Sequence, residues 1–522
     1  MDGAPPTLEL LAGFGWADAV ARARALVPEA IGPGGLRNLW GGAWNDEGAP
    51  QTTTSPVDGS SLLSLPMLDP GAARAAVAAT AEAHRTWSTV PLGERRRRVL
   101  ATVDALAEAR ELLALLLVWE IGKPWRLALA DVDRCLDGVR WYADEVERMT
   151  AGRRPLDGPV SNIASWNYPM SVLMHAMLVQ LLAGNAVVAK TPTDGGAACL
   201  TVAVALAHRE GLPVALVSGS GSRLSEPLVR DPAVGCLAFV GGRTTGGQIA
   251  ASLVDTGKRH MLEQEGLNTW GIWDFTGWDE LAAHLRKGFE YGKQRCTAYP
   301  RYVVQRRLFD RFLAMYLPVV RGLRFGHPLA VAAGAGAPPE LDFGPLINAD
   351  KVGELHGQIE EAMTKGGIPL HRGSLADGAF LPGQDLSAYL APVSILAPPA
   401  SAALHHAEPF GPVDTIVVVD SEAELLAAMN ASNGALVASV ACDDPATARR
   451  IAAELRAFKV GVNRPRSRGD RAETFGGHGA SWKGCFVGGD LLVHAVTVGA
   501  PDERLCGNFP SYSLYPEERD IV

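Results

Sequence analysis

Cys296 is the residue whose setting most suggests chemistry. It stands in "EYGKQRCTAYPR", residues 290–301, after a predicted helix and before a predicted strand, where a side chain can be presented to a ligand. Glu263 and Glu265 lie upstream in "RHMLEQEGLN", and Asn167 lies in "SWNYPM". A thiol nucleophile, a carboxylate that activates water and an amide that holds an oxyanion together suit acyl transfer through a thioester. Each alone also fits a plain role, because a lone cysteine is usually core and a glutamate is usually a surface charge.

Two glycine clusters are candidates for phosphate contacts, but neither is a complete motif. "GSGSRL" (219–224) lacks the third glycine of a dinucleotide fingerprint, and "GGRTTGGQ" (241–248) lacks the Lys-Ser/Thr ending of a phosphate loop. Either cluster also fits a plain turn.

The elements that must position these residues alternate between strand and helix from about residue 159. "PVSNIASW", "NAVVAK", "ALVSGS" and "GCLAFVGG" are strand-like, and "SVLMHAMLVQLLAG" and "GGAACLTVAVALAHREG" are helix-like. This alternation predicts a parallel sheet with crossover helices. A second αβ region is expected from about 270 to 465. The stretch "FVGGDLLVHAVTVGA", from residue 486, is predicted to be a strand that leaves the body of the domain.

Size and composition narrow the class of protein. A chain of 522 residues predicts two or three domains. A net charge of −9 disfavours nucleic acid or an anionic membrane as the main partner. The start "MDGAPPTLELLAGFGW" has no evident secretory signal, and the apolar "LLALLLVW" (112–119) is too short to cross a bilayer, so it is expected to be a buried helix. The seven dispersed cysteines predict reduced thiols in a cytoplasmic protein, with no metal site.

Eight motifs in order give the sequence a family resemblance. They are "SWNYPM", "LLAGNAVVAKTP", "AFVGGRTTGG", "MLEQEGLN", "KQRCTAYPR", "FGPLINADKV", "EPFGPV" and "TFGGHGASWKG". Their succession, from about residue 50 to 497, resembles the aldehyde dehydrogenase superfamily.

The resemblance implies an α/β fold with a Rossmann-like cofactor domain, a catalytic α/β domain and a small β oligomerisation arm. The implied ranges are 1–145 and 160–264 for the cofactor domain, 265–470 for the catalytic domain, 146–159 and 486–500 for the arm, and 501–522 for a C-terminal tail. A homodimer or homotetramer is the implied assembly.

The resemblance also assigns catalytic roles. Cys296 would attack the aldehyde carbonyl, and Asn167 with the backbone N–H of Cys296 would hold the oxyanion. Glu263 would activate the water that hydrolyses the thioester. Glu265 falls where the family has glycine and is the weaker candidate.

Cofactor contacts are implied by the same matches. Lys190 would contact the adenosine ribose and Glu408 the nicotinamide ribose. The full set of implied contacts is Trp166, Lys190, Thr193, Gly241, Gly242, Glu408 and Phe410. A carboxylate at the position of Thr193 would bind the adenosine 2′-hydroxyl and repel a 2′-phosphate, so a neutral threonine favours NADP and leaves NAD open.

Three departures from the family pattern bear on cofactor geometry and turnover. The usual "LELGGK" is "LEQEGL" here, Gly242 replaces a small hydroxyl residue, and Lys293 replaces a glycine.

Arg295 is the strongest substrate signal. "QRCT" is similar to the segment in non-phosphorylating glyceraldehyde-3-phosphate dehydrogenases and phosphonoacetaldehyde dehydrogenases, where this arginine helps hold an anionic group. A guanidinium fork suits phosphate, phosphonate or carboxylate oxygens. Arg134, on the helix "DVDRCLDGVRWYA", lies near the place where such relatives supply a second arginine. The resemblance also places Arg464, Arg466 and Arg468, in "VNRPRSRGD", on the loop that touches the substrate tail. A structural salt bridge is the alternative for Arg295.

The predicted function is NAD(P)-dependent oxidation of an aldehyde to a carboxylate through a cysteine thiohemiacetal and thioester. An anionic phospho-, phosphono- or carboxy-aldehyde is the expected substrate, with phosphorus-containing aldehydes first. A coenzyme-A-acylating semialdehyde dehydrogenase and a catalytically impaired scaffold of the same fold are the alternatives.

Overall fold

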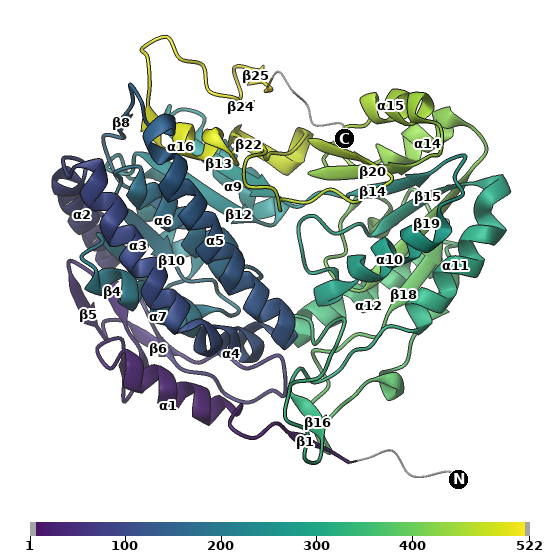
Figure 1. The fold of residues 1–522 in the computed structure, drawn as a ribbon, viewed down its shortest axis with the longest axis horizontal. Helices are drawn as coiled ribbons and strands as arrows, with labels where there is room; N and C mark the ends of the chain where they lie inside the picture. The colour runs from purple at the N-terminus through teal and green to yellow at the C-terminus, as the bar shows by residue number, and fades with distance from the viewer. Residues whose placement is uncertain (1–6, 517–522) are drawn as a thin grey trace.

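Two large sheets organise the computed structural model, which describes residues 7–516 (Figure 1). The first sheet and its helices occupy the left half of Figure 1, and the second sheet occupies the right half. In spatial order the ten strands of the first sheet are β25 (Ser513–Leu514), β24 (Gly507–Asn508), β22 (Trp482–Cys485), β13 (Arg259–Gln264), β12 (Cys236–Gly241), β9 (Val160–Ile163), β10 (Val187–Lys190), β11 (Val214–Val217), β4 (Asn38–Trp40) and β5 (Ala43–Asn45).

The centre of this sheet is parallel. Strands β11, β10, β9, β12 and β13 pair in parallel, whereas β4 and β22 join the two edges in antiparallel pairs. The chain runs outward from β9 to β10 and β11, then returns to place β12 on the other side of β9. Ligands of such open sheets bind outside the carboxyl ends of the strands, where the strand order reverses. The segments that follow β9, β12 and β13 meet at that edge.

Alternating side chains of the parallel strands pack on opposite faces. Val187 and Ala189 of β10 belong to the main core, which includes α6 and α7. Val188, between them, packs with Ala73 and Val77 of α2. Burial on both faces explains why "VVAK" is apolar for three consecutive residues, as is typical of a central parallel strand.

Most helices of the described chain lie on the side of the first sheet. They are α1 (Trp16–Leu26), α2 (Pro70–Trp87), α3 (Leu92–Glu108), α4 (Arg110–Ile121), α5 (Trp125–Met149), α6 (His175–Leu182), α7 (Ala197–Arg209), α8 (Gly221–Ser225), α9 (Arg243–Leu253) and, near the C-terminus, α16 (Asp490–Ala495). A π-helical turn, Pro169–Met174, leads into α6. Asp69 caps α2 by accepting a 2.9 Å hydrogen bond from the N–H of Ala72. Residues 112–119 lie in α4 and are buried, as predicted.

The second sheet is parallel except at one edge strand. Its order is β17 (Ile368–Arg372), β18 (Val393–Leu396), β19 (Val413–Val419), β15 (Arg301–Gln305), β14 (Thr269–Ile272), β20 (Val437–Ala441) and β21 (Lys459–Val462), with β17 antiparallel. Its helices are α10 (Trp278–Gly288), α11 (Phe309–Arg321), α12 (Ala349–Thr364), α13 (Ala403–His406), α14 (Glu422–Met429) and α15 (Pro445–Ala453). The first sheet's β13 ends at Gln264 and the second sheet's β14 begins at Thr269.

Short two-stranded ladders complete the described chain. They are β1 (Leu8–Leu10) with β16 (Ala330–Ala332), β2 (Ile31–Gly32) with β3 (Gly35–Leu36), β6 (Ala49–Gln51) with β7 (Leu65–Met67), and β8 (Arg154–Pro155) with β23 (Thr497–Val498). Within residues 7–516, no helix is both long and apolar enough to span a membrane.

The prediction of one strand from residue 486 is wrong. Gly488 and Gly489 have φ values of +77° and +50°, which end the extended backbone. The six residues of α16 follow, and only Thr497–Val498 returns to a strand.

The segments expected to form the arm come together through the β8–β23 ladder. Residues 146–149, at the start of the first segment, complete α5. Assembly through these segments stays a prediction. Of the expected tail, β24 and β25 extend the first sheet, and residues 517–522 lie outside the described range.

Candidate active site

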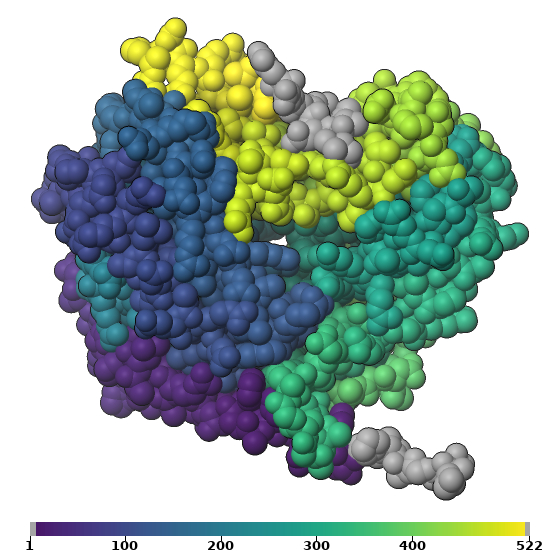
Figure 2. Space-filling model, viewed as in Figure 1, coloured from purple at the N-terminus to yellow at the C-terminus, as the bar shows by residue number. Residues whose placement is uncertain are grey.

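Cys296 lies on a loop between the two halves of the molecule, just before β15. The face in Figure 2 is hollowed where the blue helical segment, the yellow C-terminal segment and the teal and green half meet. A 3₁₀ turn, Glu290–Lys293, precedes the nucleophile. Tyr291, Gly292 and Lys293 have φ values of +62°, +59° and +58°. Left-handed backbone at two side-chain-bearing residues is costly, so the loop needs anchors elsewhere.

Lys293 supplies one anchor. Its ammonium forms a buried ion pair with Asp414 of β19 and donates to the carbonyl oxygen of Tyr299 at 2.9 Å. Tyr316 donates to the other oxygen of Asp414 at 2.8 Å. Burial lowers the pKa of Lys293 and raises that of Asp414, and the attraction between the two charges opposes both shifts. The ion pair explains how lysine is tolerated at a left-handed position where the family has glycine.

Asn268 supplies a second anchor, immediately before β14. Its Nδ2 donates to the carbonyl oxygens of Cys296 and Ala298, both at 2.8 Å. Its Oδ1 accepts from the N–H groups of Leu436 and Val437, both at 3.1 Å. The side chain is buried, so these four bonds fix the nucleophile loop to β20.

Asn167 approaches the nucleophile loop from the carboxyl end of β9. Its Nδ2 donates to the carbonyl oxygen of Gln294 at 3.0 Å, and its Oδ1 accepts from the hydroxyl of Ser165 at 2.6 Å. A primary amide has two N–H bonds, so one remains for an oxyanion. Among the described residues, the N–H of Cys296 has no acceptor. Two donors are therefore available near the sulfur.

Glu263, the penultimate residue of β13, is the carboxylate with the largest effect on the pKa of the Cys296 thiol. Burial raises the pKa of Cys296 well above its usual value, and the negative charge of Glu263 raises it further. Arg468 opposes this shift, and Glu408 adds to it. The thiol therefore rests protonated and needs a base, which Glu263 is placed to be. The charge of Glu265 acts instead on Glu408, whose pKa it raises.

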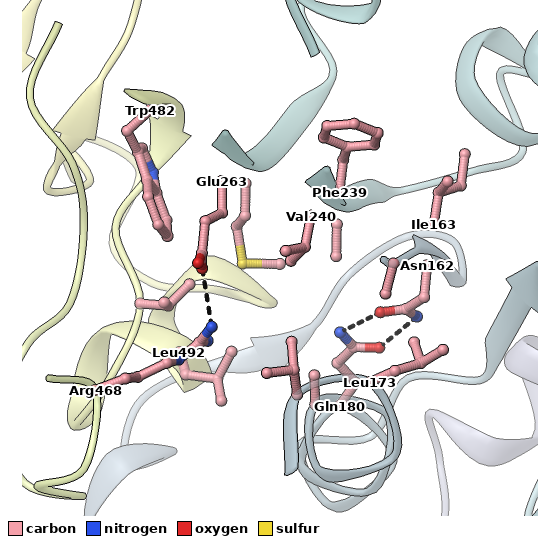
Figure 3. Close-up of a pocket in the computed structure, with 16 residues that line it drawn as sticks. Asn162, Ile163, Leu173, Gln180, Phe239, Val240, Glu263, Arg468, Trp482 and Leu492 are labelled. Carbon is pink, nitrogen blue, oxygen red and sulfur yellow. Dashed lines mark hydrogen bonds and ion pairs between the residues drawn. The ribbon is translucent and has the colours of Figure 1, made fainter. Parts of the chain in front are cut away.

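Glu263 and Arg468 form an ion pair across a small pocket (Figure 3). Nη1 of Arg468 lies 2.9 Å from Oε2 of Glu263, and the other carboxylate oxygen is buried without a hydrogen-bond partner among the described residues. Trp482 and Leu492 flank the pair, and reciprocal bonds of 2.8 and 2.9 Å between Asn162 and Gln180 lie across the pocket from it.

The cofactor candidates gather at the same edge of the first sheet. Lys190 ends β10, and its buried ammonium donates to the carbonyl oxygen of Thr191 at 2.8 Å and to Thr193 at 3.4 Å. Burial lowers the pKa of Lys190 to about 8. Gly241 ends β12, and Gly242 is the N-cap of α9, so the helix N-terminus faces this edge.

Glu408, Trp166 and Phe410 form the other side of the cofactor region. The rings of Trp166 and Phe410 meet edge to face at 6.0 Å. Both oxygens of Glu408 are buried without a hydrogen-bond partner in the described chain. Burial raises the pKa of Glu408 well above its usual value, and the charge of Glu265 adds to the rise.

These residues fit a dinucleotide. A buried carboxyl group with two unsatisfied oxygens suits ribose hydroxyls, and a helix N-terminus favours a pyrophosphate. Gln264, altered in "LEQEGL", packs against α9 at Gly246, where an added Cβ would lie 2.5 Å from the Gln264 side chain. The departure at Gln264 is thus matched by space at Gly246.

The three predicted substrate arginines occupy different positions. Arg295 is half-buried, and its Nη2 donates to the carbonyl oxygens of Gly288 at 2.8 Å and Lys287 at 3.4 Å. Among the described residues no carboxylate pairs with Arg295, so the structure does not support the alternative of a structural salt bridge, and the Nε of Arg295 is buried without a partner there. Arg134 is exposed on α5, and Arg464 is exposed beyond β21. Arg134 and Arg295 both lower the pKa of Tyr168, which burial raises overall to about 12.

Comparison with known proteins identifies the family. A model of the aldehyde dehydrogenase family matches residues 44–498. The chain belongs to the aldehyde dehydrogenase family. It is therefore an NAD(P)-dependent aldehyde dehydrogenase, and the predicted superfamily and α/β fold are confirmed.

Among the relatives, mitochondrial succinate-semialdehyde dehydrogenase of Mus musculus is 26% identical over 465 residues, covering 83% of this chain and 85% of that protein. The 3-sulfolactaldehyde dehydrogenase of Pseudomonas putida is 26% identical over 447 residues, covering 82% and 88%. The structure of NADP-dependent glyceraldehyde-3-phosphate dehydrogenase from Bacillus halodurans, complexed with NADP, has a TM-score of 0.80 and 27% identity, covering 88% and 97%.

Sequence reasoning missed several features of the site. Asn268 appeared only as the last residue of a motif, and Asp414 gave no signal because it stands 121 residues from Lys293. Arg468 was expected on the substrate loop, but nothing in its spacing indicated a pair with Glu263. Structural burial and hydrogen bonds identify all three.

Proposed function

We propose that this aldehyde dehydrogenase oxidises an aldehyde that carries an anionic group, and that water is the acyl acceptor. A phosphate, phosphonate or carboxylate is the expected group, and NADP is the favoured cofactor. Arg295 carries the substrate proposal, since a guanidinium without a carboxylate partner stands directly beside the nucleophile in the described chain. A site that leaves a cation uncompensated favours a ligand that brings the opposite charge.

The first half of the reaction needs a thiolate. Glu263 takes the proton of Cys296, and the sulfur adds to the aldehyde carbon. The free N–H of Asn167 and the backbone N–H of Cys296 then donate to the oxygen that gains charge. When bound, a nicotinamide dinucleotide supplies the hydride acceptor.

The second half of the reaction hydrolyses the thioester on Cys296. Glu263, within a largely apolar pocket, first passes the thiol proton to solvent and then takes a proton from water as the water oxygen bonds to the acyl carbon. The carbon–sulfur bond breaks, and its electron pair returns to the sulfur of Cys296. Asn268 and Lys293 keep the loop in place through both steps by their bonds to β20 and β19.

Two further observations support an anionic substrate. Arg134, Arg295 and Arg468 act on residues around the thiol, as the pKa shifts of Tyr168 and Cys296 indicate. The three relatives above are named for aldehydes with a carboxylate, a sulfonate or a phosphate. The net charge is nonetheless −9, so the positive charge is local to the site.

Thr193 supports the cofactor preference. It is exposed, uncharged and within 3.4 Å of Lys190, whereas the carboxylate that acts on the charge of Lys190 belongs to the next residue, Asp194. A hydroxyl instead of a carboxylate at residue 193 removes one source of repulsion for a 2′-phosphate.

The test is an absorbance assay at ~340 nm, where reduced nicotinamides absorb. Phospho-, phosphono- and carboxy-aldehydes are compared with neutral aldehydes of equal chain length, each with NADP and NAD. We expect higher kcat/KM for the anionic set and for NADP, with no turnover in Cys296→Ala. Equal kcat/KM for charged and neutral aldehydes refutes the substrate proposal. Turnover that requires coenzyme A identifies the acylating alternative instead.

A further inference from the structure

Arg468 is the cation that touches the catalytic carboxylate. It lies on the segment between β21 and Phe475, and its guanidinium is 5.1 Å from the centre of the Phe475 ring. The side chain of Arg468 is 31% exposed, whereas that of Glu263 is 3% exposed. Arg468, on a solvent-accessible loop, therefore points its guanidinium toward Glu263, a buried carboxylate on strand β13.

In the Glu263–Arg468 pair, both side chains keep hydrogen-bonding groups without a partner among the described residues. Oε2 of Glu263 accepts from Arg468, so that oxygen is occupied while the pair lasts. Among the described residues, only one nitrogen of Arg468 has a hydrogen-bond partner, and a guanidinium has five N–H bonds in a planar fork. Arg468 can accordingly receive a second anion beside Glu263.

We propose that Arg468 couples recognition of the substrate's anionic group to the release of Glu263. The inference rests on the proposed oxidation of anionic aldehydes and extends it to a specificity-determining residue. Without such a group, Arg468 holds the carboxylate. When a phosphate, phosphonate or carboxylate binds the unused N–H groups of Arg468, its negative charge repels Glu263 and weakens the Glu263–Arg468 pair, and Glu263 becomes free to face the water.

The step that this controls is hydrolysis. The water oxygen bonds to the acyl carbon, Glu263 takes a proton from the water, and the carbon–sulfur bond breaks with its electron pair leaving on Cys296. Water is the only co-reactant. With a neutral aldehyde, Oε1 of Glu263, which has no partner among the described residues, still takes the thiol proton, so the thioester forms. Oε2 stays on Arg468, the carboxylate does not turn toward the water, and hydrolysis is slow.

The experiment compares succinic semialdehyde with butanal, which have the same four-carbon chain with and without a carboxylate. In rapid mixing, the burst of reduced cofactor reports thioester formation, and the following steady rate reports hydrolysis. In the wild-type protein we expect hydrolysis about tenfold or more faster with succinic semialdehyde, the scale of one charge-assisted contact. In Arg468→Gln we expect the two steady rates to converge, with the butanal burst retained.

Two further variants keep the test specific. Arg471→Gln removes an arginine of the same segment that pairs with Asp137 at 3.1 Å, and it should keep the wild-type ratio of steady rates. Arg468→Lys keeps a point charge without the fork, so an intermediate ratio is expected. If Arg468→Gln fails to fold, the lysine variant carries the test, and an unchanged ratio there overturns the proposal.

A rescue measurement separates release of Glu263 from simple structural support. Acetate added to wild-type protein turning over propanal should fill the anion position and speed hydrolysis, and it should have no effect on Arg468→Gln. Equal loss of burst and steady rate with both aldehydes in Arg468→Gln would mean a structural role and overturn the inference. If wild-type protein shows no preference for anionic aldehydes, the proposed function itself is wrong. If wild-type protein has the preference and Arg468→Gln keeps the same ratio of hydrolysis rates, the proposed function stands and the role of Arg468 is wrong.

Discussion

Replacing either member of the Lys293–Asp414 ion pair should destabilise the protein with opposite dependence on pH. Both side chains are buried, at 1% and 0% exposure. Removing one partner of such a pair leaves an uncompensated buried charge and costs about 3–5 kcal/mol. We therefore expect Lys293→Met and Asp414→Asn each to lower the free energy of unfolding by about this amount near neutral pH.

The sign of the pH dependence follows from which charge remains. In Lys293→Met, Asp414 keeps a pKa raised by burial, so the folded state prefers its proton and the penalty grows as pH rises above the unfolded pKa. In Asp414→Asn, Lys293 keeps a pKa lowered by burial, so the penalty grows as pH falls below the unfolded pKa. Each limb has a limiting slope of about 1.4 kcal/mol per pH unit.

Urea unfolding followed by tryptophan fluorescence at a series of pH values between the unfolded pKa values of aspartate and lysine, about 4 and about 10, measures both effects. The double variant Lys293→Met/Asp414→Asn should lose less than the sum of the single losses and show little pH dependence. Arg306→Met is the matched control. Arg306, directly after β15, pairs with Asp420, directly after β19, but is 64% exposed, so about 1 kcal/mol or less is expected. Parallel pH slopes for the two single variants, or additive losses in the double variant, would refute the anchoring role.

Two other predictions concern the nucleophile loop and the cofactor. Asn268→Ala leaves two carbonyl groups of the nucleophile loop and two N–H groups at the start of β20 without their hydrogen-bond partner. Because Cys296 is then displaced, the burst rate should fall about 100-fold. A burst rate near that of the wild type would show that the loop is held without Asn268. The apparent KM for the cofactor should rise as the pH increases through about 8, because Lys190 loses its charge there. Lys190→Met should have a high KM that does not change over this pH range. A wild-type KM that stays constant would contradict the contact between Lys190 and the cofactor.

Sequence patterns predicted the parallel sheet well because its strands are buried on both faces. "NAVVAK" and "GCLAFVGG" are apolar runs bounded by glycine or asparagine, and they correspond to β10 and β12. The strand expected from residue 486 failed because its apolar residues also fit a short helix, and two glycines with positive φ decide between them. The apolar pattern of the sequence does not predict the φ values of these two glycines, so it does not distinguish a strand from a short helix here.

The site was predictable only as a set of residue types. Cys296, Glu263 and Asn167 follow from motif order, but which arginine of "VNRPRSRGD" points inward depends on how the loop is held. Arg466 is buried against Glu473 at 2.8 Å, whereas Arg468 reaches Glu263. Alternate residues of one loop thus have different partners, and no spacing rule applies to irregular backbone.

Among the departures from the family pattern, Lys293 and Gln264 each have a neighbouring feature that accommodates them, and Glu265 does not. Lys293 has Asp414, and Gln264 has the space at Gly246. Glu265 has no accommodating feature of this kind. Burial raises the pKa of Glu408, and the negative charge of Glu265 raises it further. A carboxyl group with a raised pKa holds its proton more readily, and in the protonated form it can donate to a ribose oxygen as well as accept from a hydroxyl. The substitution at Glu265 therefore changes the hydrogen-bonding character of the ribose contact that the family resemblance implies for Glu408.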